Sequence, residues 1–203
     1  MDRPLGRAVG NALEIRECVE TLAGRGPDDL VAVVNALGVR VLQRAGRAPD
    51  RETALVLLDE ARRSGAGLRK LRDMVAAQGG DPAVVDDPSR LPAAPVVDVL
   101  TAAADGPVSD LDAALVGRAA VLLGAGREKK GDPVDHAAGV VIRAAVGDLV
   151  TRGDPVLELH GPDAARVAQA RAAVTPAVVI GGPIDQTPLV RAHVDADGRV
   201  EQF

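Results

Sequence analysis

Aromatic side chains are almost absent from this 203-residue chain, in which Phe203 is the single Phe, Tyr or Trp. The hydrophobic core must therefore be built from Ala, Val, Leu and Ile. Proteins that bind single-stranded nucleic acid usually stack bases on aromatic rings, and this chain has no set of rings for that purpose. An excess of positive charge is lacking as well, because the formal net charge is −5. We therefore expect no nucleic-acid partner.

Cysteine is nearly absent too. Cys18 is the only one, so no disulfide can form within the chain. Its position between Ile15 and Leu22 on a helical face predicts a small buried side chain rather than a reactive thiol. No secretory signal opens the chain, and no apolar run approaches the roughly 18 residues that span a bilayer. We expect a cytoplasmic protein without a membrane partner.

Residues 1–80 predict four amphipathic helices separated by breaks that contain Gly or Pro. The first is expected over residues 12–24, with Asn11 as N-cap and Glu14 three positions later. The second begins at Pro27, and its helical spacing predicts one apolar face made of Leu30, Val33, Val34, Leu37 and Val41. Helices of this kind usually cover a sheet. Because residues 1–80 offer no strands, we expect the sheet to come from a missing segment or from a partner.

The character of the chain changes after four prolines that mark residues 81–95 as a linker. Strands are expected at 96–104, 139–145, 155–160, 177–180 and 189–194, and helices at 113–123 and 162–174. We therefore expect two domains, residues 1–92 and residues 93–203. The predicted fold class is α/β: a helical layer of an incomplete α/β domain (1–80), followed by a β-rich α+β domain.

Side chains that commonly carry catalysis do not form a recognisable set in this sequence. The histidines, which are His136, His160 and His193, have neither a Cys nor a second His among their sequence neighbours, so a zinc site is not expected. None of the three serines lies in a Gly-x-Ser-x-Gly elbow. We predict no catalytic residue and no organic cofactor site in this chain.

Three stretches of the sequence are similar to the pyrimidine nucleoside phosphorylases. The first runs from Met1 to Glu14 and reads MDRPLGRAVGNALE, against the family pattern M-x-x-P-L-G-x-A-V-G-N-A-L-E. The second covers residues 76–87, and the third extends from residue 101 to residue 148. The order and spacing match over nearly the whole chain. One departure is Pro107, where members of the family usually carry an aromatic residue.

The resemblance implies the C-terminal part of a pyrimidine nucleoside phosphorylase of the thymidine phosphorylase type. Such pentosyltransferases are homodimers that convert a pyrimidine nucleoside and phosphate reversibly into the free base and a pentose 1-phosphate. Whether the nucleoside is thymidine alone stays open. The family's phosphate loop and the groups around the base lie upstream of the position that matches Met1, so we expect this chain to be inactive alone. The Gly124-Ala125-Gly126 turn with Lys129 and Lys130 falls on a family motif, and we interpret it as structural.

The resemblance also implies a potassium site. Its ligands in this chain would be the main-chain carbonyls of Leu5 and Ala8 and the carboxylate of Glu17, because carbonyl oxygens can replace the hydration shell of potassium. An unbroken helix from Ala8 to Glu17 would separate their Cα atoms by about 13 Å. The chain must therefore bend near Gly10, and the helix must begin only after Asn11. The alternative interpretation is that Glu17 is an exposed helix charge.

A different class of function also fits the sequence. The turns at 147–148 and 153–154 are similar to those of barrel-sandwich domains that carry lipoyl or biotinyl groups, but Lys129 and Lys130 precede the hairpin instead of occupying its tip. The alternative is therefore a non-catalytic binding or dimerisation module. In either case the apolar helix faces would lack a covering sheet, and we expect the purified chain to be prone to aggregation or partly molten.

Overall fold

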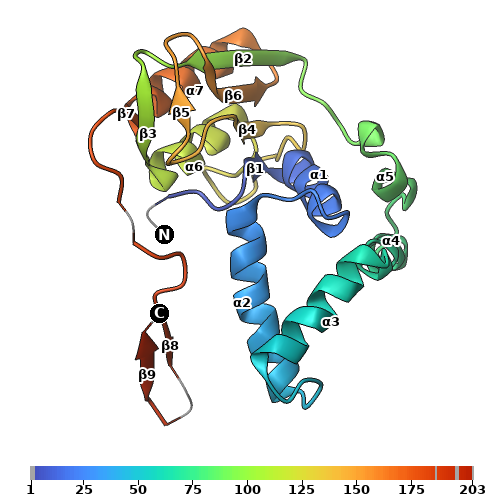
Figure 1. The fold of residues 1–203 in the computed structure, drawn as a ribbon. Helices are drawn as coiled ribbons and strands as arrows, with labels where there is room; N and C mark the ends of the chain where they lie inside the picture. Colours follow the sequence, from blue (N-terminus) through green and yellow to red (C-terminus); the bar gives the residue numbers. More distant parts are fainter. Residues whose placement is uncertain (1–2, 186, 195–196, 203) are drawn as a thin grey trace.

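The computed structural model describes residues 3–185, 187–194 and 197–202, and it contains a sheet-bearing part and a helical part (Figure 1). The helices are α1 (Asn11–Leu22), α2 (Asp28–Arg44), α3 (Arg51–Arg63), α4 (Ala66–Ala77), α5 (Ala83–Asp86), α6 (Ala113–Leu123) and α7 (Ala164–Val174). The strands are β1 (Ala8–Gly10), β2 (Val96–Thr101), β3 (Gly106–Leu111), β4 (Gly139–Ile142), β5 (Leu149–Val150), β6 (Pro155–Gly161), β7 (Val178–Ile180), β8 (Ala192–Val194) and β9 (Val200–Gln202). Helices thus precede antiparallel sheets, as predicted. Within the described ranges, no helix is both long enough and apolar enough to cross a membrane.

The four predicted N-terminal helices are present, and α2 runs away from the sheets while α3 returns towards α4 at an angle to it (Figure 1). Asp50 caps α3, because its carboxylate accepts a hydrogen bond from the Thr53 N–H at 2.7 Å. The prediction that Cys18 is buried is wrong. Helix α1 buries Ala12, Leu13 and Val19 and turns the thiol outward.

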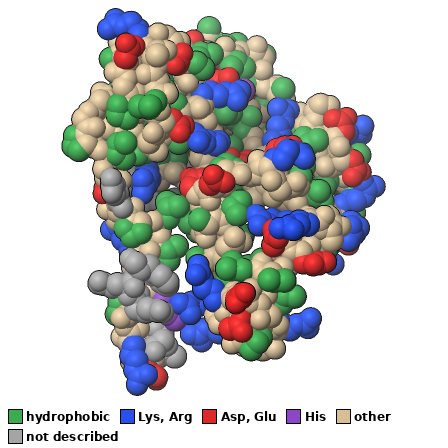
Figure 2. Space-filling view, in the orientation of Figure 1, with side chains coloured by type: hydrophobic (Ala, Val, Ile, Leu, Met, Phe, Trp, Pro, Cys, Tyr) green, Lys and Arg blue, Asp and Glu red, His purple; other side chains and the backbone are tan. Residues whose placement is uncertain are grey.

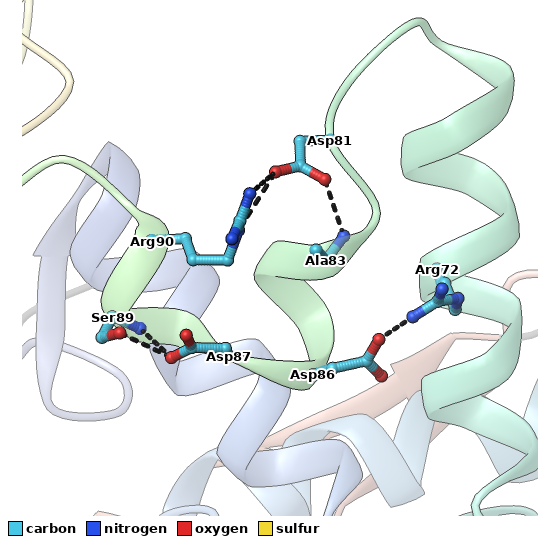
Figure 3. A network of polar contacts seen from close by, with 7 residues as sticks. All are labelled: Arg72, Asp81, Ala83, Asp86, Asp87, Ser89 and Arg90. Atoms are coloured by element: carbon cyan, nitrogen blue, oxygen red, sulfur yellow. Dashed lines mark hydrogen bonds and ion pairs between the residues drawn. The ribbon is translucent and has the colours of Figure 1, made fainter.

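The predicted linker at residues 81–95 is ordered by α5, a 3₁₀ turn and a set of polar contacts (Figure 3). Asp81 Oδ2 accepts hydrogen bonds from the Arg90 guanidinium at 2.8 and 3.1 Å, and Arg72 of α4 pairs with Asp86 of α5. The remaining contacts join Ala83 to Asp81 and Ser89 to Asp87. Each of these exposed contacts contributes little to stability in salt, so they act mainly to define the path from α4 to β2.

The main hydrophobic core lies in the sheet-bearing part, between a four-stranded sheet and helices α6 and α7. The strand order is β1-β4-β6-β2, and a second sheet has the order β5-β3-β7. The inward side chains of β6 alternate with outward ones, and they pack against the two helices. Leucines with exposures of at most 1% mark the centre: Leu111, Leu123, Leu157 and Leu159. Aliphatic burial of this kind contributes about 1.5–3 kcal/mol for each large side chain.

Strands β3 and β5 lie outside the predicted elements. The stretch Gly106–Leu111 contains Gly, Pro, Ser and Asp, so its sequence lacks the alternation typical of a strand. It nevertheless pairs with both β5 and β7, and Val108 and Leu111 are buried in the core. Tertiary packing therefore overrides the weak local preference of this segment.

The prediction that residues 1–80 offer no strand is wrong, because β1 forms the edge of the four-stranded sheet. Ala8 lies opposite Val141, and Gly10 lies opposite Gly139. A Cβ atom on Gly10 would lie 2.6 Å from the Ala138 carbonyl oxygen, and one on Gly139 would lie 2.4 Å from the carbonyl oxygen of Val9. The close approach of β1 to β4 therefore requires glycine on both strands.

The apolar face predicted for the second helix is uncovered over much of its length. Val34, Leu37 and Val41 of α2 have exposures of 48%, 65% and 65%, and Val56 of α3 is 61% exposed. Figure 2 shows apolar side chains interspersed with charged ones over the helical part of the visible face. An apolar row at helical spacing in water is typical of a face that packs against another polypeptide.

We expect Leu37→Lys to change the free energy of unfolding by less than about 0.5 kcal/mol, since the side chain already contacts water. The same substitution should reduce aggregation, measured by light scattering. Leu111→Ala, at a buried position, should lower the free energy of unfolding by about 2–5 kcal/mol in denaturant titrations. Equal losses in the two variants would show that the α2 face is covered.

Candidate functional site

The segment from Pro4 to Gly10 passes between the start of α2 and the edge of the four-stranded sheet before it enters α1. Gly6 has a φ of +74°, in the left-handed region, and strand β1 ends at Gly10, which has a φ of +151° and a ψ of −176°. Helix α1 begins at Asn11, and the predicted bend near Gly10 is confirmed. We call residues 5–8 the carbonyl loop, because they include both predicted carbonyl ligands.

The predicted cap of α1 is wrong. Gly10 is the N-cap residue and no side chain caps the helix. Asn11 lies one position inside, and its Nδ2 donates a hydrogen bond to the Ala125 carbonyl oxygen at 3.0 Å. Glu14 accepts a hydrogen bond from the Gly10 N–H at 2.9 Å. Asn11 therefore ties α1 to the end of α6, and Glu14 satisfies an N–H group that precedes the helix.

Glu17 lies against the carbonyl loop. Its Oε1 accepts a hydrogen bond from the Arg7 N–H at 2.6 Å, and the Ala8 N–H also bonds to its carboxylate. The side chain is partly buried, so the alternative interpretation of Glu17 as an exposed helix charge is wrong. Glu17 lies nine positions after Ala8, and it reaches the loop because the chain bends near Gly10.

Negative charge is concentrated around this loop. Burial raises the pKa of Glu17, and the nearby carboxylates of Asp29 and Glu14 raise it further. The N–H groups of Arg7 and Ala8 act in the opposite direction, and the net pKa lies above the usual value. Ionised Glu17 is therefore an unfavourable charge in the folded chain, which a cation beside it would stabilise.

The main-chain geometry leaves the Ala8 carbonyl available to such a cation. Arg7 C=O accepts a hydrogen bond from the Ile142 N–H at 2.7 Å. Because bonding directions alternate along an antiparallel strand, the N–H and C=O of Ala8 point away from β4, towards α1. The same residue's N–H reaches Glu17. The Ala8 carbonyl and the Glu17 carboxylate beside it are therefore of the ligand types that the resemblance implies for potassium.

A cavity of about 310 Å³ adjoins the loop and has both charge signs on its wall. Arg7 Nη1 lies 3.2 Å from Asp148 Oδ2 there, and Arg3 and Asp29 also line the cavity. Among residues 3–185, 187–194 and 197–202, no three His, Cys, Asp or Glu side chains gather as a metal site. The cation-binding capacity of the loop would thus depend mainly on carbonyl oxygens.

The Gly124-Ala125-Gly126 turn follows the end of α6, and its interpretation as structural stays a prediction. Gly124 has a φ of +108° and ends α6, and its N–H bonds to the Val121 carbonyl oxygen at 2.9 Å. The Lys129 N–H donates to Asp132 Oδ2 at 2.8 Å. The first contact ends α6, and the second closes a separate turn over residues 129–132.

Sequence reasoning missed Asp29 and the loop contact of Glu14. Asp29 Oδ2 accepts a hydrogen bond from the Gly6 N–H at 3.0 Å. The sequence marks Asp28 and Asp29 only as the acidic start of a helix, which is a sufficient local reason for both residues. Both aspartates lie more than 20 residues from Gly6, so no local pattern in the sequence indicates this contact.

We expect Gly6→Ala to destabilise the chain more than Gly24→Ala. Both glycines have positive φ, +74° and +83°, so both substitutions carry a backbone strain of about 1–3 kcal/mol. A Cβ at Gly6 would also displace the Glu17 carboxylate, which accepts a hydrogen bond from the Arg7 N–H, whereas nothing lies within 4 Å of a Cβ at Gly24. Denaturant titrations of both variants measure the difference, and equal losses would contradict the placement of Glu17.

A second polar cluster lies on the outer face of the four-stranded sheet. Arg143 makes two hydrogen bonds to Glu158, at 2.7 and 2.8 Å, and His160 Nε2 lies 3.3 Å from the same carboxylate. The Arg143 guanidinium lowers the pKa of Glu158 despite its partial burial. Ionised Glu158 therefore stabilises the fold above its usual pKa, and this contribution is lost as the pH falls through the lowered value.

Glu158→Gln should therefore flatten the acid limb of the stability curve. The unaltered chain should lose stability more steeply below about pH 4.5 than the variant, because only the chain with Glu158 must protonate a stabilised carboxylate. Thermal melts at a series of pH values measure the slope. When Arg143 is also replaced by Ala, the chains with and without Glu158→Gln should lose stability equally steeply in acid. A persistent difference would show that a residue other than Arg143 stabilises ionised Glu158.

Comparison with known proteins gives two findings. Residues 107–181 match the family described as the pyrimidine nucleoside phosphorylase C-terminal domain. The pyrimidine-nucleoside phosphorylases of Bacillus subtilis and Geobacillus stearothermophilus are each 43% identical to this chain over 160 residues, and that of Staphylococcus haemolyticus is 44% identical over 160 residues. These alignments cover 79% of this chain and 37% of each relative. The chain therefore spans little more than a third of the length of the curated relatives it matches.

Proposed function

Because the chain belongs to the pyrimidine nucleoside phosphorylase family over its aligned residues, we propose that it is the C-terminal, scaffold part of a thymidine phosphorylase type of enzyme. The proposed reaction converts thymidine and phosphate into thymine and 2-deoxyribose 1-phosphate, in a homodimer of longer subunits. The observation that carries the proposal is the 43% identity over 160 residues to relatives named for this activity. The chain alone is proposed to be inactive.

The uncovered α2 face supports the proposal that the chain is inactive without a further segment. Leu37 and Val41 are each 65% exposed, and they form a row with Val34 along one side of the helix. Covering such side chains contributes about 1.5–3 kcal/mol each, which is enough to drive association with a further segment. We propose that this segment holds the phosphate and the nucleoside, and that the sheet-bearing part described here supports it.

Potassium is the proposed ion of the carbonyl loop, held by the carbonyls of Leu5 and Ala8 and the carboxylate of Glu17. The ion would supply positive charge among Glu14, Glu17 and Asp29, where burial and mutual repulsion disfavour ionised Glu17. The chain's own contribution is to orient the loop. Glu17 holds the Arg7 N–H from α1, and β4 holds the Arg7 carbonyl oxygen from the other side.

A chimera tests the proposed activity. The segment of the Bacillus subtilis relative that precedes its aligned region is fused to the N-terminus of this chain, and thymine release from thymidine and inorganic phosphate is followed by chromatography. We expect turnover from the chimera and none above background from the chain alone. The relative itself is the positive control.

Two results would overturn the proposal. Turnover by the isolated chain would show that the preceding segment is dispensable. A chimera that folds cooperatively and is nevertheless inactive would favour the non-catalytic binding or dimerisation module. A Leu37→Lys, Val41→Lys variant of the chimera is expected to lose activity together with association of its two segments, since lysine cannot be buried against an apolar surface without a large penalty.

A further inference from the structure

We infer that Asp29 is a positioning residue of the carbonyl loop: by holding the Gly6 N–H from the start of α2, it orients the loop for a monovalent cation. The cation itself belongs to the proposed function, and this inference rests on it. Asp29 acts through the loop and is not proposed as a ligand.

The two carboxylate oxygens of Asp29 join two elements. Oδ1 accepts a hydrogen bond from the Leu30 N–H at 2.8 Å, within the first turn of α2. Oδ2 accepts one from the Gly6 N–H at 3.0 Å, in the loop. Both oxygens thus bind main-chain N–H groups, which makes Asp29 a rigid connection between α2 and Gly6. Hydrogen bonds to a charged acceptor are stronger than neutral ones.

Gly6 is the position where the loop needs such a connection. A glycine with a φ of +74° has no conformational preference of its own for this turn. The next residue is held by Glu17 of α1, at 2.6 Å from the Arg7 N–H, and Gly10 is held by Glu14, at 2.9 Å. Three carboxylates from two helices therefore hold the N–H groups along this stretch, and Asp29 is the only one of the three on α2.

The other end of the loop is anchored independently. Arg3 Nη2 donates a hydrogen bond to the Thr187 carbonyl oxygen at 2.7 Å, in the segment that follows β7. Pro4 and Leu5 lie between this anchor and Gly6. Loss of the Asp29 contact should therefore loosen residues 5–8 without releasing the chain as a whole. This restricted effect distinguishes a positioning role from a general structural one.

Asp28 provides the matched control. It is the first residue of α2, it carries the same charge, and its side chain is exposed. Both aspartates interact with the helix dipole in the same way. Asp28→Ala should therefore reproduce the effect of a lost helix-terminal charge, and Asp29→Ala should add the loss of the Gly6 contact. Asp29→Asn keeps an acceptor oxygen and removes the charge.

Amide hydrogen exchange of the full 203-residue chain, in potassium chloride and in choline chloride at equal ionic strength, tests the inference. In choline, Asp29→Ala should accelerate exchange in residues 5–10 at least about tenfold, the effect of one hydrogen bond to a charged group. Asp28→Ala should stay within about twofold of the unaltered chain, and Asp29→Asn should fall between it and Asp29→Ala, because a neutral acceptor forms a weaker hydrogen bond than a carboxylate. Exchange in β4 and β6 should not change, which confirms that the variant is folded.

Potassium provides the second readout. The concentration that half-protects residues 5–10 should rise at least about tenfold in Asp29→Ala, and Asp29→Asn should restore it in part. Any of three results would overturn the inference. The loop amides could exchange equally fast in Asp29→Ala and in the unaltered chain, or they could be unprotected in the unaltered chain. Asp29→Asn could also accelerate exchange as much as Asp29→Ala. If potassium protects no variant and the choline result holds, the proposed cation site fails and the positioning role of Asp29 stands as a role in loop structure.

Discussion

The pairing of β1 with β4 is the interaction on which the arrangement of this molecule depends. It is possible because Gly10 and Gly139 face each other without side chains, where a Cβ atom would collide with a carbonyl oxygen. This contact joins the N-terminal segment to the sheet of the second part. It places the start of α1 beside α6, and it presents the carbonyl loop at the sheet edge. Two hydrogen bonds add to this joint, from Asn11 to the Ala125 carbonyl oxygen and from the Ala12 N–H to the His136 carbonyl oxygen.

The same pairing explains why the candidate site combines groups that are distant in sequence. Arg7 C=O binds β4, so the Ala8 N–H of the same peptide unit points to the opposite side, and the Arg7 N–H donates a hydrogen bond to Glu17. Asp29 approaches from α2 and completes the set. Burial and the neighbouring carboxylates raise the pKa of Glu17, and the proposed cation would stabilise its ionised form. The site thus combines a rigid support from the sheet with charges from two helices.

The helical part is less completely packed than the sheet-bearing part, because the described residues leave much of its apolar surface exposed. Its own small cores contain few buried side chains, centred on Val19, Leu71 and Val85 and on Val39, Ala48 and Ala54. The sheet-bearing part has a continuous core of aliphatic side chains that includes α6 and α7. Stability is therefore unequal between the two parts. If the helical part packs against a further segment, as proposed, its local stability would rise towards that of the sheet-bearing part.

The sequence by itself determined the helices of both parts, the strands β2, β4 and β6, and the bend at Gly10, since periodicity and glycine placement are local signals. It also carried the family resemblance through the stretch from Met1 to Glu14. Only the tertiary structure decided that β1 is a strand, that β3 lies in a sheet despite its composition, that Asn11 binds Ala125 instead of capping α1, and that Asp29 reaches Gly6. The reason is that each of these contacts joins residues far apart in the chain, whose local sequences are equally compatible with a loop, a cap or a solvated charge.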